Sequence, residues 1–382
     1  MKFPQNLQSK LDLRQQNNAL RVLVEPNSLI DFSSNDYLGF AKSAAIFNQT
    51  HQFLIDRKIR TNGATGSRLL SGNHGLYNET ENYIANFHQS ETALIFNSGF
   101  DANVGFFGSV PQRNDLIFFD ALSHASIRDG ILMSKAKSYK FNHNDFEHLE
   151  QLISKFKNSS AEIYIVTESV FSMDGDSPNL AELVDLSNKY NCNLVVDEAH
   201  ALGVFGEKGE GLVQQMQLQD AVFARIMTFG KGLGCHGAAI LGSSNLKNYL
   251  INFARSFIYT TGLAPHAIAT IYLAYQELAK KPNNLLQLRQ NIIFFNQQKQ
   301  LLSLKNIFVR SKSAIQSALF PGNENVKKLA LHLNKHAIDV KAILSPTVAE
   351  GQERLRICLH NYNSEKEITD VLHLLSTFVF SS

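Results

Sequence analysis

The fold is decided by three neighbouring stretches of the sequence: AEIYIVTESVFSMDGD (161–176), NLVVDEAHALG (193–203) and RIMTFGKGLGCHGAAILG (225–242). In each stretch a short apolar run ends in polar residues. Short apolar runs bounded by turn residues are typical of strands buried inside a parallel sheet. The sequence therefore predicts three parallel strands with polar residues at their ends.

Polar and ionisable side chains follow each of these predicted strands. They are Glu168 and Ser169, then Asp197 and His200, then Thr228 and Lys231. Ligands of open α/β sheets bind beyond the carboxyl ends of the strands, so we expect these side chains at one edge of the sheet. The set suits an aldehyde cofactor, because an amine can form an imine while a carboxylate faces a ring nitrogen. Pyridoxal phosphate is the first hypothesis.

The composition indicates a large protein with balanced charge. The chain has 382 residues, of which 44% are hydrophobic and 18% charged. Single cores stop growing at about 250–300 residues, so a second domain is expected. The 36 basic and 34 acidic residues give a net charge of +2, which offers no support for a nucleic-acid surface.

The cysteines and the N-terminus bear on the cellular compartment. The three cysteines lie far apart, and neither they nor the histidines have the spacing of a metal site or a disulfide framework. The stretch MKFPQNLQSKLDLRQQNN (1–18) is polar and unlike a signal peptide. No apolar run approaches the roughly 18 residues that cross a bilayer. We expect a cytoplasmic protein without a metal, a membrane or a nucleic acid as partner.

Helix and strand alternate over residues 91–242, which predicts a large, doubly wound, mostly parallel sheet of the α/β class. Beyond Pro282 the pattern changes to α+β. The elements expected there are helices at 285–304, 326–337 and 365–378 and strands at 307–310, 315–320 and 354–359. We predict an N-terminal arm (1–40, amphipathic over 1–20), a large domain (41–282) and a small C-terminal α+β domain (283–382).

Two glycine-containing segments are candidates for ligand binding. RTNGATGSRLLSGNHG (60–75) has four glycines and no apolar periodicity, which suits backbone lying close to a ligand or a partner. Ser98, Gly99 and Phe100 lie between a predicted strand (93–96) and a predicted helix (101–110). A helix N-terminus in that position is a site for anions, because free N–H groups point out of it.

Several short motifs fail when their context is considered. GLGCHG (232–237) matches a dinucleotide-binding pattern, but a strand-like AAILG follows instead of a helix, and no acidic residue lies at the required distance. DEAH (197–200) matches a helicase box, but the chain lacks a G-x-x-x-x-G-K-[ST] loop. Neither a nucleotide-binding oxidoreductase nor a helicase is therefore favoured.

The candidate site residues also have plainer interpretations. Lys231 could be a solvated loop lysine, and His200 or His124 a packed histidine. Asp197 could be a helix N-cap or a satisfied structural carboxylate. Ser169 and Thr228 could simply cap turns. The glycines on both sides of Lys231 and the presence of Asp197 favour a role for this lysine in forming the imine.

Arg354 and Arg356 share one face of a predicted strand. From the spacing alone, a solvated edge strand is favoured. The alternative is a guanidinium fork that clamps the carboxylate of an amino acid.

Eight stretches of the chain together resemble the α-oxoamine synthases, a pyridoxal-phosphate family with the aspartate-aminotransferase-type fold (fold type I). They are SSNDYLG, TGSRLLSGNH, FNSGFDAN, SHASIRDG, TESVFSMDGD, VVDEAHALGVFG, TFGKGLG and RLRI. The resemblance covers nearly the whole chain. It implies a homodimer with its sites at the interface.

The resemblance also implies a role for each matching residue. Lys231 would carry the imine, with Asp197 on the ring nitrogen and His124 stacked on the ring. The remaining cofactor contacts would be His200 and Ser169 on the hydroxyl side, Ser98, Gly99, Phe100 and Thr228 at the phosphate, and Thr260 and Thr261 at the partner's phosphate. The substrate contacts would be Asn35 and Arg356 for the amino acid and Arg21 and Thr347 for the acyl group.

Within the family, the stretches favour the branch that serves biotin synthesis. The implied reaction is a decarboxylative condensation of L-alanine with a pimeloyl thioester of coenzyme A or of an acyl carrier protein. The alternatives use glycine with acetyl-CoA or serine with a long acyl thioester. A non-catalytic homologue is disfavoured because Lys231 is present. Four places depart from the family pattern: Asn62, Gly232, Cys235-His236 and Ser317.

Overall fold

The computed structural model describes residues 3–23, 28–156, 160–280 and 283–380. They group into two compact units, each treated separately below. The large unit comprises 35–172 and 177–286, and the small unit comprises 1–34, 173–176 and 287–382. The predicted boundary at Pro282 lies outside the described residues, and the division into three domains stays a prediction.

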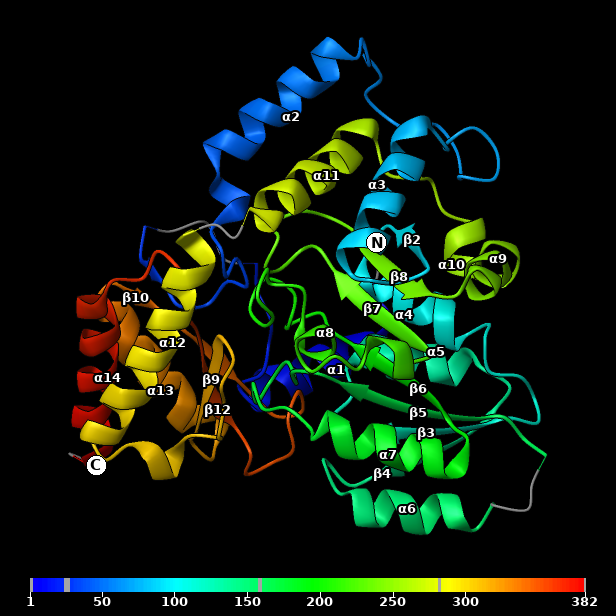
Figure 1. The fold of residues 1–382 in the computed structure, drawn as a ribbon. Helices are drawn as coiled ribbons and strands as arrows, with labels where there is room; N and C mark the ends of the chain where they lie inside the picture. Colours follow the sequence, from blue (N-terminus) through cyan, green and yellow to red (C-terminus); the bar gives the residue numbers. More distant parts are fainter. Residues whose placement is uncertain (1–2, 24–27, 157–159, 281–282, 381–382) are drawn as a thin grey trace. The chain divides into compact units, whose positions relative to one another are not determined.

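A seven-stranded sheet forms the centre of the large unit (Figure 1). Its order is β2-β8-β7-β6-β5-β3-β4. The strands are β2 (Thr92–Phe96), β3 (Leu116–Asp120), β4 (Lys137–Phe141), β5 (Ile163–Glu168), β6 (Asn193–Asp197), β7 (Ala224–Thr228) and β8 (Ala238–Gly242). Only the pairings of β8 with its two neighbours are antiparallel. The predicted mostly parallel α/β sheet is therefore confirmed.

Helices cover both faces of this sheet, because successive strand residues point to opposite sides. On β5, Ile165 belongs to one apolar core and Val166 to the other. The core that contains Ile165 includes residues of helices α6 (Phe146–Ser154), α7 (Leu180–Tyr190) and α8 (Leu212–Gln215). The core that contains Val166 includes residues of helices α4 (Gly99–Phe107), α5 (Ala125–Met133), α9 (Ser244–Phe253) and α10 (Arg255–Ile258).

Three further helices of the large unit pack together: α2 (Ala44–Asp56), α3 (Gly75–Phe87) and α11 (Pro265–Ala279) (Figure 1). Helix α11 begins at Pro265 and is largely buried, as its apolar sequence indicates. Helix α2 was not anticipated from the sequence. Residues 60–74, between α2 and α3, form neither helix nor strand, in agreement with the irregular loop predicted there.

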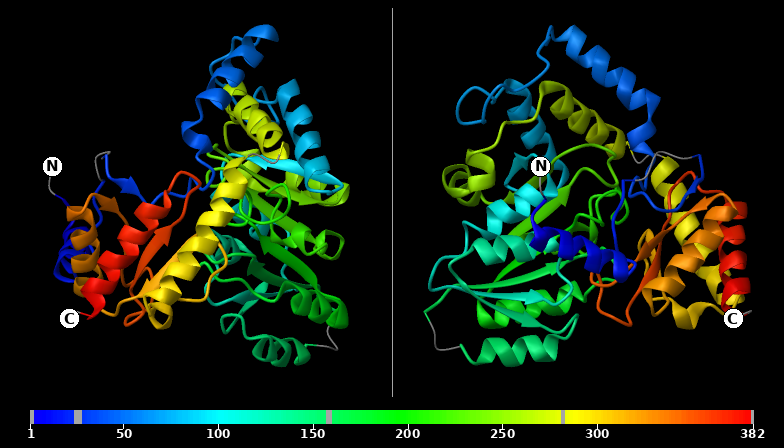
Figure 2. Two further views of the ribbon diagram at one scale, coloured as in Figure 1. Left: turned by 60° about the vertical axis from the view of Figure 1, so that its left-hand side comes forward. Right: turned by 180° about the vertical axis from the view of Figure 1, so that it is seen from behind.

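The small unit is of the α+β type. Its main sheet has the order β11-β12-β9, with β9 (Ile315–Leu319), β11 (Lys341–Ile343) and β12 (Arg354–Cys358), all antiparallel. A second pairing joins β1 (Ile30–Asp31) to β10 (Ile338–Asp339). Helix α12 (Asn283–Leu301) leads into the C-terminal part. Helices α13 (Asn323–Lys335) and α14 (Glu365–Phe380) lie side by side (Figure 2, orange and red).

The remaining elements are short or terminal. Among the described residues, 3-10 helices occur at Phe40–Lys42, Gln219–Ala221 and Lys305–Ile307. Helix α1 (Gln5–Gln16) includes no buried residue, and its Leu7, Leu11 and Leu13 side chains are exposed. The expected amphipathic arm is thus a helix without a buried face in the single chain. No helix in the described part of the chain has the length and apolar character needed to cross a membrane.

The strand predicted at residues 307–310 is wrong. The 3-10 turn at Lys305–Ile307 uses the first residue of that run, and only Phe308 forms an isolated bridge, to Ala318. The pairing does not extend into a strand.

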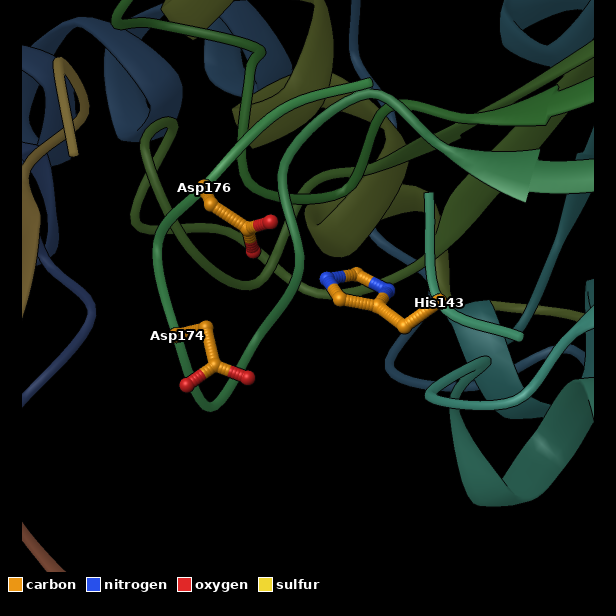
Figure 3. Close-up of side chains that lie close together, drawn as sticks. All are labelled: His143, Asp174 and Asp176. Carbon is orange, nitrogen blue, oxygen red and sulfur yellow. The ribbon is translucent and has the colours of Figure 1, made fainter. Parts of the chain in front are cut away.

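The solvated edge favoured for Arg354 and Arg356 is also wrong. Strand β12 is the middle strand of its sheet, and both arginines are only 6% exposed. A charge this deep needs a partner, and Arg354 forms an ion pair with Asp174. Asp174 and Asp176 lie on the loop drawn in Figure 3.

Candidate active site

The polar ends of the three central strands meet at one edge of the large sheet. Strands β5, β6 and β7 are parallel neighbours, and Glu168 at the end of β5 pairs in register with Asp197 at the end of β6. Thr228 ends β7, and Lys231 follows three residues later. The predicted convergence of these residues is confirmed.

Asp197 is buried and held as a hydrogen-bond acceptor on both oxygens. Its Oδ2 accepts from Asn103 Nδ2 at 2.8 Å, and its Oδ1 accepts from the main-chain N–H of Ala199 at 2.9 Å. No helix begins here, since residues 198–211 form turns, so the N-cap interpretation is wrong. Both oxygens of this carboxylate are therefore held in place by donors.

Lys231 belongs to a chain of four polar side chains. Its Nζ lies 2.7 Å from His200 Nε2, and His200 Nδ1 lies 2.6 Å from the hydroxyl of Tyr37. That hydroxyl donates to Asn35 Oδ1 at 3.1 Å. Lys231 is half-buried and hydrogen-bonded, so it is not a solvated loop lysine. The structure thus brings together three predicted site residues, Lys231, His200 and Asn35.

His124 caps the N-terminus of α5 and is tied to Asp197 through two further residues. Its Nδ1 lies 2.7 Å from Ser126 Oγ and accepts from the Ser126 main-chain N–H at 3.2 Å. Asn103 Nδ2 donates to Ser126 Oγ at 3.0 Å as well as to Asp197. One amide therefore fixes both the carboxylate and the imidazole at this edge of the sheet.

Three residues of this network were not predicted: Tyr37, Asn103 and Ser126. Each lies inside a stretch that carries the family resemblance, namely SSNDYLG, FNSGFDAN and SHASIRDG. Nothing in the local pattern distinguishes them from residues that merely complete a turn or a helix.

The electrostatics of the site follow from burial. Burial, and then the nearby positive charge of Lys231, lower the pKa of His124, which keeps its imidazole neutral near pH 7. Burial, and then the negative charge of Asp197, raise the pKa of Glu168 well above its usual range. Glu168 Oε1 accepts from the main-chain N–H of His124 at 2.6 Å.

Glu168→Gln is expected to make the stability of the protein less sensitive to pH. With its pKa raised above the reference value of 4.5, Glu168 stays protonated in the folded chain at pH values where the unfolded chain has lost that proton. Stability therefore falls as pH rises from 4.5 through the folded pKa. Glutamine cannot ionise and keeps the acceptor for His124.

Denaturant unfolding at acidic and at neutral pH measures the effect. The variant should lose less stability than the wild type between the two conditions. Glu162→Gln, at an exposed position just before the same strand, is the control and should behave like the wild type. A parallel loss in wild type and Glu168→Gln would show that Glu168 does not titrate in this way.

The predicted anion site lies where α4 begins. A Cβ built on Gly99 would come within 2.4 Å of Thr228 Oγ1, so Gly99 and Thr228 lie side by side and only a glycine leaves room there. The Ser98 hydroxyl caps α4 by accepting from the Asp101 N–H at 3.0 Å. Phe100, the next residue of α4, is 50% exposed. The first N–H groups of a helix have no partner within it and can bind a phosphate.

Thr260 and Thr261 lie close to this anion site within the same chain. Asn97 Nδ2 donates to Thr260 Oγ1 at 3.1 Å and to the carbonyl of Thr261 at 2.7 Å. Their predicted role toward a second subunit stays a prediction. Ser169 lies beside Asp197, with its N–H donating to the Asp197 carbonyl at 2.9 Å and its Oγ 3.5 Å from the same oxygen.

The other predicted substrate residues belong to the small unit. Arg21 Nη2 donates to Thr347 Oγ1 at 3.3 Å, so these two residues, 326 positions apart, lie together as their shared predicted role requires. Arg356 is buried in β12, and its Nη1 lies 2.9 Å from Cys358 Sγ.

The rejected motifs have structural roles. GLGCHG (232–237) leads into strand β8, as anticipated, and a Cβ on Gly232 would lie 2.3 Å from the Leu202 carbonyl oxygen. The departure from the family pattern at this position therefore coincides with a close backbone contact. Glu198 of the DEAH stretch accepts from the N–H groups of Leu212 and Val213 and so holds the start of α8.

The donor set at this edge of the sheet fits pyridoxal phosphate. A half-buried amine can meet an aldehyde, a carboxylate held by two donors can face a ring nitrogen, and a neutral imidazole can lie against the ring. The glycine cradle beside Thr228 at a helix N-terminus suits the phosphate.

Comparisons with known proteins agree with this geometry. Residues 27–374 match the family model described as aminotransferase class I and II. An 8-amino-7-oxononanoate synthase of Emericella nidulans is 38% identical over 94% of this chain and 91% of that protein. The crystal structure of an 8-amino-7-oxononanoate synthase from Francisella tularensis is 29% identical, with a TM-score of 0.79 over 93% of this chain and 99% of that chain.

A serine palmitoyltransferase from S. paucimobilis has a TM-score of 0.89 over 99% of this chain and 97% of that chain, at 22% identity. At that identity the likeness concerns the fold. It agrees with the fold type expected from the sequence.

Proposed function

Since the chain belongs to the class I and II aminotransferases, and within them to the α-oxoamine synthases, we propose that it produces 8-amino-7-oxononanoate for biotin synthesis. It is a pyridoxal-phosphate-dependent acyltransferase. In the proposed reaction L-alanine and a pimeloyl thioester give the amino ketone, carbon dioxide and the free thiol. The observation that carries the proposal is the set formed by Lys231, His200 and Asp197 at the end of the central strands.

Residues are assigned to each part of the cofactor: the ring, the hydroxyl and the phosphate. We assign the ring to Lys231, Asp197 and His124, the hydroxyl side to His200 and Ser169, and the phosphate to Ser98, Gly99, Phe100 and Thr228. In the proposed homodimer, Thr260 and Thr261 of the partner subunit complete the phosphate site. The bound cofactor supplies an electron sink for the charge that develops at the α-carbon of the amino acid.

The protein side of the chemistry is proton movement and charge control. Lys231 Nζ takes the proton from the α-carbon and later returns one, which is general base and general acid catalysis. Asp197, whose carboxylate oxygens are held by two donors, would accept a hydrogen bond from the ring nitrogen and so keep that nitrogen protonated. His124, neutral through burial, covers the ring without adding a positive charge.

Polar side chains are assigned to each of the two substrates. Arg356 suits the carboxylate of the amino acid, since a guanidinium forms paired, charge-assisted hydrogen bonds with a carboxylate. Asn35 adds an amide that is already tied to Tyr37. Arg21 and Thr347, hydrogen-bonded to each other, would bind the acyl substrate.

The proposal is tested by titrating the cofactor-loaded enzyme with L-alanine, glycine and L-serine while recording its visible spectrum. We expect L-alanine to change the spectrum and to release free thiol from pimeloyl-CoA or from pimeloyl-acyl carrier protein. A response to glycine alone would assign the enzyme to acetyl-CoA chemistry instead. A response to serine with a long acyl thioester would equally overturn the assignment to biotin synthesis.

A further inference from the structure

Tyr37 lies in the middle of a row of hydrogen-bonded side chains that runs from Lys231 through His200 to Asn35. The residues around it in the sequence did not indicate a role for it. It follows Asn35 in SSNDYLG, and its side chain is fully buried. Its hydroxyl contacts two predicted site residues, His200 Nδ1 at 2.6 Å and Asn35 Oδ1 at 3.1 Å. A buried tyrosine normally needs at least one hydrogen-bond partner, and this one has two that face the site.

The direction of each hydrogen bond follows from which atoms carry protons. When Lys231 is an ammonium it has only hydrogens to give, and His200 Nε2 then accepts from it. A neutral imidazole then carries its proton on Nδ1, which donates to the Tyr37 oxygen. The single hydroxyl proton of Tyr37 goes to Asn35 Oδ1, which can only accept. All three bonds run in one direction, from the amine to the amide.

We propose that Tyr37 is a positioning residue that stabilises the Nδ1-protonated tautomer of His200 by accepting from Nδ1, and that it couples His200 to Asn35. This inference rests on the proposed function. The Tyr37 hydroxyl would link His200, which is assigned to the cofactor hydroxyl, to Asn35, which is assigned to the amino acid. A phenyl ring at position 37 would keep the packing and remove that link.

Tyr275 offers a matched control for Tyr37. Tyr275 is also fully buried, and its hydroxyl lies 2.9 Å from Nε2 of the buried His88. Tyr37→Phe and Tyr275→Phe therefore each remove one buried Tyr–His hydrogen bond. Only the first of them lies at the proposed site.

The test uses the full-length chain with nitrogen-15-labelled histidine, without added cofactor. The signals of His200 are assigned by their loss in His200→Gln. We expect the wild type to carry the ring proton of His200 on Nδ1. In Tyr37→Phe this N–H loses its hydrogen bond to residue 37, so the His200 signals should shift towards a mixture of tautomers, while Tyr275→Phe leaves them unchanged. A proton on Nε2 in the wild type, or an unchanged His200 signal in Tyr37→Phe, would overturn the proposal.

A second measurement uses the cofactor-loaded enzyme. Loss of one net hydrogen bond is expected to weaken cofactor binding about tenfold in Tyr37→Phe and to raise the KM for the amino acid more than it lowers kcat. Equal affinities in Tyr37→Phe and Tyr275→Phe would count against the coupling. The tautomer measurement needs no substrate, so it stands even if the amino acid titration were to reject L-alanine.

Discussion

Lys231→Ala yields a folded protein that binds no cofactor covalently and forms product at least about 10³-fold more slowly than the wild type. The variant removes the nitrogen that meets the aldehyde and, with it, the base that moves the proton at the α-carbon. General base catalysis alone contributes about 10²–10⁴-fold, and the covalent attachment adds to this. The His200 imidazole also loses the donor 2.7 Å from its Nε2.

Two measurements check this expectation: release of free thiol from the acyl donor, and the near-ultraviolet absorption of the cofactor that stays with the polypeptide after borohydride reduction of the imine, denaturation and gel filtration. Lys208→Ala, on an exposed turn, is the control and should retain both. Cofactor absorption that stays with reduced and denatured Lys231→Ala would place the attachment on another residue and remove the basis of the mechanism.

Asp197→Asn is expected to lower the rate about 10²–10³-fold while the protein still folds. The change removes the negative charge that keeps the ring nitrogen protonated. It also creates a local conflict, because both partners of the carboxylate, Asn103 Nδ2 and the Ala199 N–H, are donors. An asparagine presents one oxygen and one NH₂ group, so one of these donors loses its acceptor, at a cost of about 1–3 kcal/mol in the free energy of unfolding.

Asp120→Asn is the matched control for this prediction. Asp120 is a fully buried carboxylate at the end of β3 that accepts from the N–H groups of Leu122 and Asn144 and from His143 Nδ1 (His143 is drawn in Figure 3). It should lose stability in the same way but keep its cofactor affinity and activity. If both variants lost activity in proportion to stability alone, Asp197 would have no specific part in the chemistry.

The sequence could predict the active edge of the sheet because two simple regularities apply there. Apolar runs mark buried parallel strands, and the residues after them must meet at one edge, so Asp197, Thr228 and Lys231 could be named without a structure. The anion site was predictable for a similar reason, since Gly99 lies where a strand passes into a helix.

The residues that orient this set could not be predicted in the same way. Tyr37 reaches His200 across 163 positions, and Asn103 reaches Asp197 across 94. Both depend on how loops and helices pack, which periodicity does not encode. The expectation that Arg354 and Arg356 face solvent failed for a related reason: charged residues are seldom buried unless paired, and the partner of Arg354 is a distant aspartate.

Helix α1 has a consequence for measurements on the intact protein. None of its residues is buried in the single chain, and a helix of 12 residues is marginal in water on its own. Its amide hydrogens should therefore exchange with deuterium far faster than those of α4, whose residues lie in the apolar core. Slow exchange in α1 would show that Leu7, Leu11 and Leu13 are covered in the intact protein in solution.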